Sequence, residues 1–254
     1  MAEMTEKSDS RSDRGDRRGR GYAVLSFVFR NRFLLLLVFL FLMVIIGPLL
    51  RQSLGAILGD YTENFLFVLI FLTCLRSISR TRGLFLTVLA IGAVCVALTI
   101  CNVFLRFDSI DVAIFSVDAL FVALICIGIL WHILLQKRVD ADTIMGGVCV
   151  YILLGMMWAF LYAILEYLEP GSFMSASGAE DFQHPDAVFT SLWYFSYTTL
   201  TTMGYGDIVP LSEMSRGLAI VEAVVGQMYV IVFIARLLGF HVAGHQLKLQ
   251  STNK

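Results

Sequence analysis

The sequence is poor in charge and in proline. Of its 254 residues, 15% are Asp, Glu, Lys or Arg, and four are proline. Soluble domains carry about 25% charged and about 45–50% apolar residues. Because 58% of this chain is hydrophobic, the composition excludes an ordinary soluble domain and indicates a membrane protein. The net charge of −1 gives no sign of a nucleic-acid partner.

The sequence also lacks any arrangement of reactive side chains typical of catalysis or metal binding. The five cysteines lie in apolar runs without CxxC or metal-type spacing, and we interpret them as small buried hydrophobes. We find no nucleophile, carboxylate pair or metal cluster arranged for chemistry. The sequence therefore predicts a protein that is not an enzyme, has no cofactor and has no recognisable regulatory ligand.

Long hydrophobic runs dominate the rest of the chain. A helix needs about 20 mainly apolar residues to cross the hydrocarbon core of a bilayer. On this criterion we predict six transmembrane spans, at roughly 33–50, 58–77, 84–105, 111–135, 144–167 and 216–239. The polar residues before the first span cannot bury enough surface to fold alone, so residues 1–32 are expected to form a disordered basic tail.

The second span is the weakest, because its first turns contain Asp60, Glu63 and Asn64. Arginine and lysine gather in cytoplasmic loops. The basic clusters in the tail, at 76–83 and at 136–138 fall on one side of the membrane only if this span crosses. We therefore predict a multi-pass protein of the cell membrane with both termini in the cytoplasm.

The segment between the last two spans is predicted to enter the membrane without crossing it. Residues 168–185 read as an exposed turret, and residues 186–200 form a helix that is too short to span at about 1.5 Å per residue. The stretch TTMGYGDIVP then contains Gly204 and Gly206, which favour conformations that helices do not use. Non-helical backbone at this depth must be buried in protein or line a watery path.

The two closely spaced glycines permit alternating backbone conformations. The carbonyl groups from Thr202 to Tyr205 can then all point one way, together with the Thr202 hydroxyl. Rings of such oxygens can replace the water around a potassium ion, but one chain supplies one loop and a ring needs about four. Closed rotational symmetry is the simplest solution, so we expect a homotetramer around a central pore.

This stretch resembles the filter of the potassium channel family. Residues 202–207 read Thr-Met-Gly-Tyr-Gly-Asp where that family has Thr-Val-Gly-Tyr-Gly-Asp, and the resemblance covers residues 186–238. The chain looks most like the short bacterial six-transmembrane channels. The resemblance implies an all-α membrane protein with a re-entrant pore helix and filter between spans 5 and 6, assembled as a tetrameric K⁺ channel. Met203 departs from the usual valine, and its longer side chain must pack behind the filter.

The resemblance also divides the chain. Residues 33–138 look like a voltage-sensor-like four-helix domain without charge, residues 139–240 form the pore domain, and residues 241–254 form a short cytoplasmic tail. The pore domain comprises an outer helix at 144–167, the turret at 168–185, a pore helix at 186–200, the filter at 201–207 and an inner helix at 216–239. The implied K⁺ ligands are Thr202, Met203, Gly204 and Tyr205, with filter support from Thr201, Gly206, Asp207 and Tyr194.

The sequence suggests roles for three further residues, and two of them have an alternative interpretation. Asp207 is implied to accept a hydrogen bond from Tyr194, which stands where many members have tryptophan, or it attracts cations at the outer mouth. Gly226 stands at the position of the family's hinge glycine, although glycine also serves close helix packing in membranes. Gln227 is expected to face the water-filled cavity below the filter.

Two carboxylates inside the predicted spans need partners, because charge within the membrane is costly. We expect Glu222, on the inner helix, to support the pore helix through Thr198 or Thr199. The alternative is that it adds negative potential to the cavity. The candidate partners of Asp118 are Asn102, Arg106 and Arg51.

The fourth span lacks the charges of a voltage sensor. Voltage-sensing helices carry arginine at every third position, but residues 111–135 contain no Arg or Lys. The membrane field therefore finds little charge to move. We expect a potassium channel that is voltage-insensitive or weakly voltage-dependent. A poorly selective cation channel and a non-conducting scaffold or sensor with a pore-like fold are the alternatives.

Overall fold

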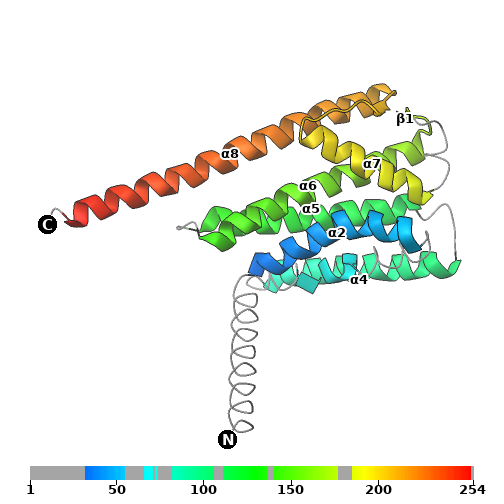
Figure 1. Cartoon of the computed structure of the whole chain (residues 1–254). Coiled ribbons are helices and arrows are strands. Elements are labelled where there is room, and N and C mark those ends of the chain that lie inside the picture. Colours follow the sequence, from blue (N-terminus) through cyan, green and yellow to red (C-terminus); the bar gives the residue numbers. More distant parts are fainter. Residues whose placement is uncertain are drawn as a thin grey trace, which may run out of the picture.

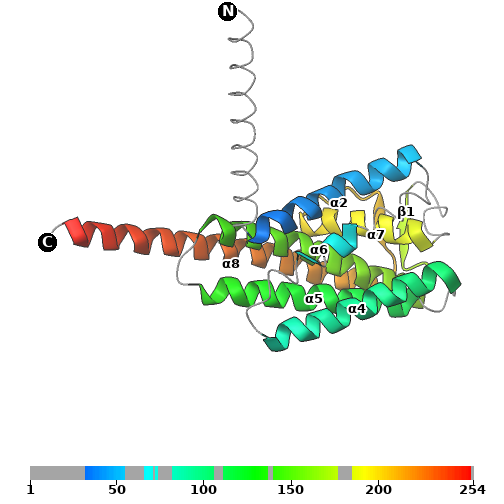
Figure 2. The same cartoon turned by 90° about the horizontal axis from the view of Figure 1, so that it is seen from below.

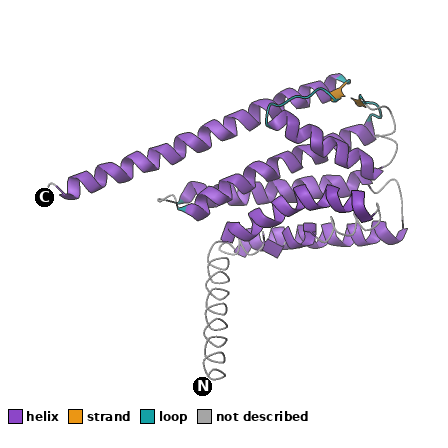
Figure 3. Cartoon of the chain, viewed as in Figure 1, coloured by secondary structure: helices purple, strands orange, loops and turns teal. Residues whose placement is uncertain are grey.

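The computed structural model describes residues 32–54, 66–70, 72–73, 82–105, 111–136, 140–176 and 185–252. These ranges are mainly helical, with two short strands (Figures 1 and 3). The helices are α2 (Arg32–Leu54), α4 (Arg82–Leu105), α5 (Asp111–Leu135), α6 (Ala141–Leu168), α7 (Pro185–Leu200) and α8 (Glu213–Thr252), and the strands are β1 (Phe173–Ser175) and β2 (Ile208–Pro210).

Helix α6 lies at the centre of the fold. It contacts α5 and α2 as well as α7 and α8, while α4 packs on α5. Of its most apolar stretch, 56% is buried, compared with 11% in α8. A helix that is apolar on all of its faces can be buried among other helices. Figure 2 shows α8 running past α6 and continuing beyond the end of the bundle.

Acidic residues organise the helix ends at the start of α6. Asp140 is its N-cap, and Oδ1 of this residue accepts a hydrogen bond from the Thr143 N–H at 2.8 Å. Such a cap satisfies a backbone donor that has no partner within the helix. Asp142 Oδ1 accepts from the Phe33 N–H at 3.1 Å, which ties the beginning of α2 to α6.

The helices predicted at 33–50, 84–105, 111–135, 144–167 and 186–200 are present, with ends shifted by up to four residues. Within the described ranges, three helices are long and apolar enough to cross a membrane, and two apolar helices are shorter. The three are Asp111–Leu135, Ala141–Leu168 and Glu213–Gly239, and the shorter two are Phe33–Ile45 and Leu86–Leu98. The span predicted at 58–77 and the tail at 1–32 lie largely outside the described residues, so the six-span topology stays a prediction.

Two features differ from the sequence-based expectation. The inner helix was predicted to end at residue 239, but α8 continues to Thr252, so most of the tail assigned to residues 241–254 is helical. No proline follows residue 239 to stop the helix, and the later residues include good helix formers. In addition, β1 and β2 pair antiparallel, with Phe173 opposite Pro210, in a chain expected to be all-α.

Gly155 allows α6 and α7 to approach closely. A methyl group on Gly155 would lie 2.6 Å from Cε1 of Tyr197. The Tyr197 ring cannot move away freely, because its hydroxyl donates to the Ile152 carbonyl at 2.7 Å. The contact therefore requires a residue without Cβ.

We predict that Gly155→Ala lowers the stability of the protein by about 1–3 kcal/mol, the usual cost of overpacking a close contact. Gly217→Ala is the matched control, because a Cβ at this helical position in α8 meets nothing within 4 Å in the chain. Thermal unfolding in detergent should show a lower midpoint for the first variant only. Equal midpoints for both variants would contradict the packing role of Gly155.

Candidate ion-conduction site

The loop after α7 is fixed to the end of that helix by its own backbone. The Thr198 carbonyl accepts hydrogen bonds from the N–H groups of Met203 at 2.8 Å and Gly204 at 3.2 Å. The Thr199 carbonyl accepts from the Thr202 N–H at 2.9 Å. The last carbonyls of a helix have no partner within it, so the loop both satisfies them and is held against the helix end.

The loop backbone alternates in conformation. Positive φ angles occur at Thr202 (61°), Gly204 (50°) and Gly206 (76°), at every second residue. The glycines were predicted to adopt such conformations, which cost them little. Thr202 was not, because a β-branched residue with positive φ is a strained outlier of the kind that clusters at functional sites. This alternation is the one that the aligned-carbonyl interpretation requires.

The loop has few partners within one chain. All side chains from Thr201 to Asp207 are exposed, with Met203 at 59% and Tyr205 at 65%. No residue that the structure describes donates a hydrogen bond to the backbone carbonyls of 202–205. These carbonyls are therefore available as ligands. The expectation that the Met203 side chain packs behind the filter finds no support in the isolated chain.

A hydrogen bond braces the outer end of the loop. The Tyr194 hydroxyl donates to Asp207 Oδ2 at 2.7 Å, which is the contact that the family resemblance implies. This bond to the carboxylate raises the pKa of Tyr194 to about 12, so the hydroxyl remains a donor at neutral pH. The Asp207 carbonyl in turn accepts from the Ala176 N–H at 2.7 Å, just after β1.

The two strands attach the segment after the loop to the top of α6. Ser172 is the anchor, because its carbonyl accepts from the Leu211 N–H at 2.7 Å and from the Ser215 hydroxyl at 3.0 Å. Glu166 on α6 accepts from the N–H groups of Gly171 and Phe173 at 2.7 and 3.0 Å. The sequence could not reveal these three-residue strands, since they are too short for a period-two pattern.

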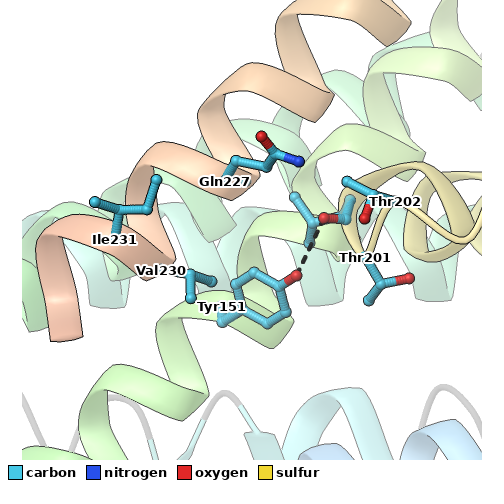
Figure 4. A pocket seen from close by; sticks show the side chains of 8 residues that line it. Tyr151, Thr201, Thr202, Gln227, Val230 and Ile231 are labelled. Atoms are coloured by element: carbon cyan, nitrogen blue, oxygen red, sulfur yellow. Dashed lines mark hydrogen bonds between the residues drawn. The ribbon is translucent and has the colours of Figure 1, made fainter.

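A pocket of about 340 Å³ lies between the start of the loop, α6 and α8 (Figure 4). It is lined by Tyr151, Leu200, Thr201, Thr202, Gly226, Gln227, Val230 and Ile231. The Tyr151 hydroxyl donates to the Leu200 carbonyl at 3.1 Å, which ties the end of α7 to α6. Gln227 and Thr202 line the same space, so the structure brings together a residue of the predicted inner helix and a residue of the predicted filter.

Gly226 meets the end of α7 closely. A methyl group on this residue would lie 2.6 Å from Leu200 Cδ1 and 3.0 Å from the Leu200 carbonyl oxygen. The structure therefore gives a packing reason for Gly226. The hinge interpretation does not follow from these contacts.

Glu222 contacts the pore helix at a residue other than those predicted. It is 0% exposed, and its partners are Ser196 on α7 at 2.6 Å and Tyr162 on α6 at 2.5 Å. Thr198 is unsuitable because its hydroxyl donates back to the Phe195 carbonyl of its own helix at 2.9 Å. Ser196 lies one turn before Thr199 on the same face of α7, so the predicted support was placed one turn too late.

Asp118 on α5 is buried, with 8% of its surface exposed. Its hydrogen-bond partner is the thiol of Cys95 on α4, a residue interpreted from the sequence as only a small hydrophobe. The candidate partners Asn102, Arg106 and Arg51 have side chains outside the described set. Asp118 and Cys95 together link α5 to α4 by a polar contact.

One comparison with known proteins matches part of the chain. A family model described as an ion channel matches residues 149–242, which include α7, the loop and the part of α8 that can cross a membrane. No curated protein and no solved structure matches the chain. The match supports an ion channel family, passive ion conduction and a non-enzymatic transport protein. With the apolar helices it indicates a membrane protein.

We predict that Tyr194→Phe weakens the outer end of the loop, because a net contribution of about 1 kcal/mol is lost with one hydrogen bond. The ratio of K⁺ to Na⁺ flux in liposomes should fall. Tyr194→Trp is the matched variant, since its indole N–H is also a donor, and it should retain more of the ratio. An unchanged ratio in the phenylalanine variant would show that the Tyr194–Asp207 bond does not brace the loop.

Proposed function

We propose that four copies of the chain form a potassium-selective channel that conducts K⁺ passively across the cell membrane. The observation that carries this proposal is the backbone of residues 202–206, with positive φ at every second residue. Four successive carbonyl groups, from Thr202 to Tyr205, receive no hydrogen bond from the described residues. Carbonyl oxygens arranged in rings can replace the hydration shell of K⁺.

The exposure of the loop supports assembly into a tetramer. Irregular backbone at membrane depth is tolerated only where it is buried in protein or lines a watery cavity. One chain provides neither for residues 201–207, whose side chains are all exposed. Further copies around an axis would enclose the loops, and a carbonyl ring needs about four of them. In this proposal the ring, and not the single chain, binds the ion.

The direction of α7 supports a cation pathway. Helix α7 ends at Leu200, beside the pocket lined by Thr201, Thr202 and Gln227. A helix carries the equivalent of about −0.5 charge at its C-terminus, which favours cations nearby. Four such ends would lower the energy of a cation in the cavity below the filter. We further propose that both chain termini are cytoplasmic, following the positions of the basic clusters.

We predict that Gly204→Ala and Gly206→Ala each abolish K⁺ selectivity or conduction, because a Cβ disfavours their positive φ angles. Purified protein in liposomes is tested for flux of K⁺, Rb⁺ and Na⁺. Gly171→Ala is the matched control: Gly171 also has a positive φ, of 87°, and free space around it, but it lies outside the loop. This control should retain selectivity.

The same assay separates the alternatives. Wild-type flux that does not discriminate between K⁺ and Na⁺ would indicate a poorly selective cation channel. Absence of flux from correctly assembled protein would indicate a scaffold or sensor. Normal K⁺ selectivity in either glycine variant would contradict the filter assignment itself.

We also predict that open probability varies only weakly with voltage. The field does work of about 2.3 kcal/mol per charge per 100 mV, but α5 carries no Arg or Lys for it to move. Planar-bilayer recordings should show a shallow dependence, arising from ions within the filter. A steep curve equivalent to several charges per subunit would contradict the assignment of 33–138 as a domain without a charged voltage sensor.

A further inference from the structure

Glu222 lies at the junction of three helices. It belongs to α8, and its two carboxyl oxygens contact Tyr162 on α6 and Ser196 on α7. Its side chain is 0% exposed. Among the residues that the structure describes, the titratable groups that face it are tyrosines, Tyr162 and Tyr151 on α6 and Tyr197 on α7. These groups are neutral near pH 7, so none provides a positive charge to balance a carboxylate.

The number of protons in this junction can be counted from the distances. Ser196 Oγ lies 2.6 Å from Glu222 Oε1 and 2.7 Å from the Gly155 carbonyl oxygen. A serine hydroxyl has one proton to donate, and a carbonyl oxygen only accepts. If Glu222 were ionised, both neighbours of the hydroxyl would be acceptors. One of the two contacts would then bring lone pairs together without a proton.

A proton on Glu222 removes this conflict. The carboxylic acid then donates to Ser196 Oγ, and the Ser196 hydroxyl donates to the Gly155 carbonyl. Tyr162 donates to Glu222 Oε2, so each of the three contacts contains one proton. We propose that Glu222 is a neutral carboxylic acid in the native protein. It acts as a positioning residue that locks the pore helix to the inner and outer helices.

Glu166 shows the opposite arrangement in the same region of the fold. Its two oxygens accept from the backbone N–H groups of Gly171 and Phe173. Backbone N–H groups cannot turn to become acceptors, so an ionised carboxylate satisfies both contacts. The chain thus contains a matched control carboxyl, on α6, for which an added proton offers no advantage.

The contacts of Glu222 with Ser196 and Tyr162, called the lock below, also determine where the filter lies. In this respect the inference rests on the proposed function. Ser196 lies half a turn before Thr198, whose carbonyl holds Met203 and Gly204 in place. A displacement of α8 would therefore move α7 through Glu222, and with it the loop. Loss of the Glu222 proton would break one of the two hydrogen bonds of Ser196 and free the pore helix.

The first test is spectroscopic and does not depend on conduction. The infrared spectrum of full-length purified wild-type protein at neutral pH should show the C=O band of a protonated carboxyl. Subtracting the spectrum of Glu222→Gln should reveal this band, because the variant should have lost it. Glu166→Gln should leave the band in place. Retention of the whole band in Glu222→Gln would overturn the proposal, whatever the flux assay shows. Presence of the band in a protein without K⁺ flux would leave this proton assignment standing while the proposed function failed.

The second test separates a neutral lock from a negative charge. The amide of Glu222→Gln can donate to Ser196 and accept from Tyr162, so it reproduces the neutral acid at any pH. Wild type should lose K⁺ over Na⁺ selectivity when the pH is raised far enough to ionise Glu222, and Glu222→Gln should resist this loss. A severalfold fall in K⁺ flux of Glu222→Gln at neutral pH would instead show that the negative charge is required.

Variants that interrupt the row of hydrogen bonds from Tyr162 through Glu222 and Ser196 to Gly155 complete the test. Ser196→Ala removes its central hydroxyl and keeps Glu222, so it should lower both the thermal unfolding midpoint and the selectivity ratio at neutral pH. Tyr162→Phe removes one donor and should lower the same two quantities by less. If Ser196→Ala matches wild type in both measurements, the lock does not position the pore helix.

Discussion

The structure depends on one constraint, which is that backbone polar groups at membrane depth need partners. Residues 201–207 are neither helix nor paired strand, and the hydrocarbon of a membrane provides no water to solvate backbone of this kind. The N–H groups of Thr202, Met203 and Gly204 are used at the end of α7, through the carbonyls of Thr198 and Thr199. The carbonyls of residues 202–205 have no partner among the described residues. We propose that K⁺ and the loops of other copies satisfy them.

Helix α6 provides the frame on which this loop is held. Of the hydrogen bonds that join it to α7 and α8, four run between a side-chain hydroxyl and a backbone carbonyl. They run from Tyr151 to Leu200, from Tyr197 to Ile152, from Tyr229 to Gly147 and from Ser196 to Gly155. Hydroxyls at membrane depth need acceptors as much as the backbone does. These bonds therefore fix the positions of α7 and α8 where apolar packing alone would allow sliding.

The sequence predicts those parts of the fold that have a long-range signal. Hydrophobic length placed the helices, and the glycine spacing placed the loop, since only residues without Cβ adopt its conformations readily. The sequence does not predict which of two residues one helical turn apart makes a given contact. Glu222 could be expected to reach α7, but the choice of Ser196 over Thr199 depends on how far α8 is displaced along α7. No sequence pattern encodes that displacement.

The strained backbone of Thr202 and the two short strands were not predicted from the sequence for a different reason. Thr202 adopts a positive φ because the loop on both sides is held, and nothing in a threonine indicates this. The strands β1 and β2 exist because Glu166 and Ser172 fix their ends. Both features are consequences of tertiary contacts, which override local preference.

The central claim is that the carbonyls of residues 202–205 coordinate K⁺ in rings made by four chains. The most direct measurement is anomalous diffraction from crystals of the assembled protein soaked in rubidium or thallium ions, which substitute for K⁺ and can be located individually. We expect a row of ion peaks on a fourfold axis, level with the carbonyl oxygens of Thr202, Met203, Gly204 and Tyr205. An assembly without this symmetry, or with the loops turned away from the axis and no ion between them, would contradict it.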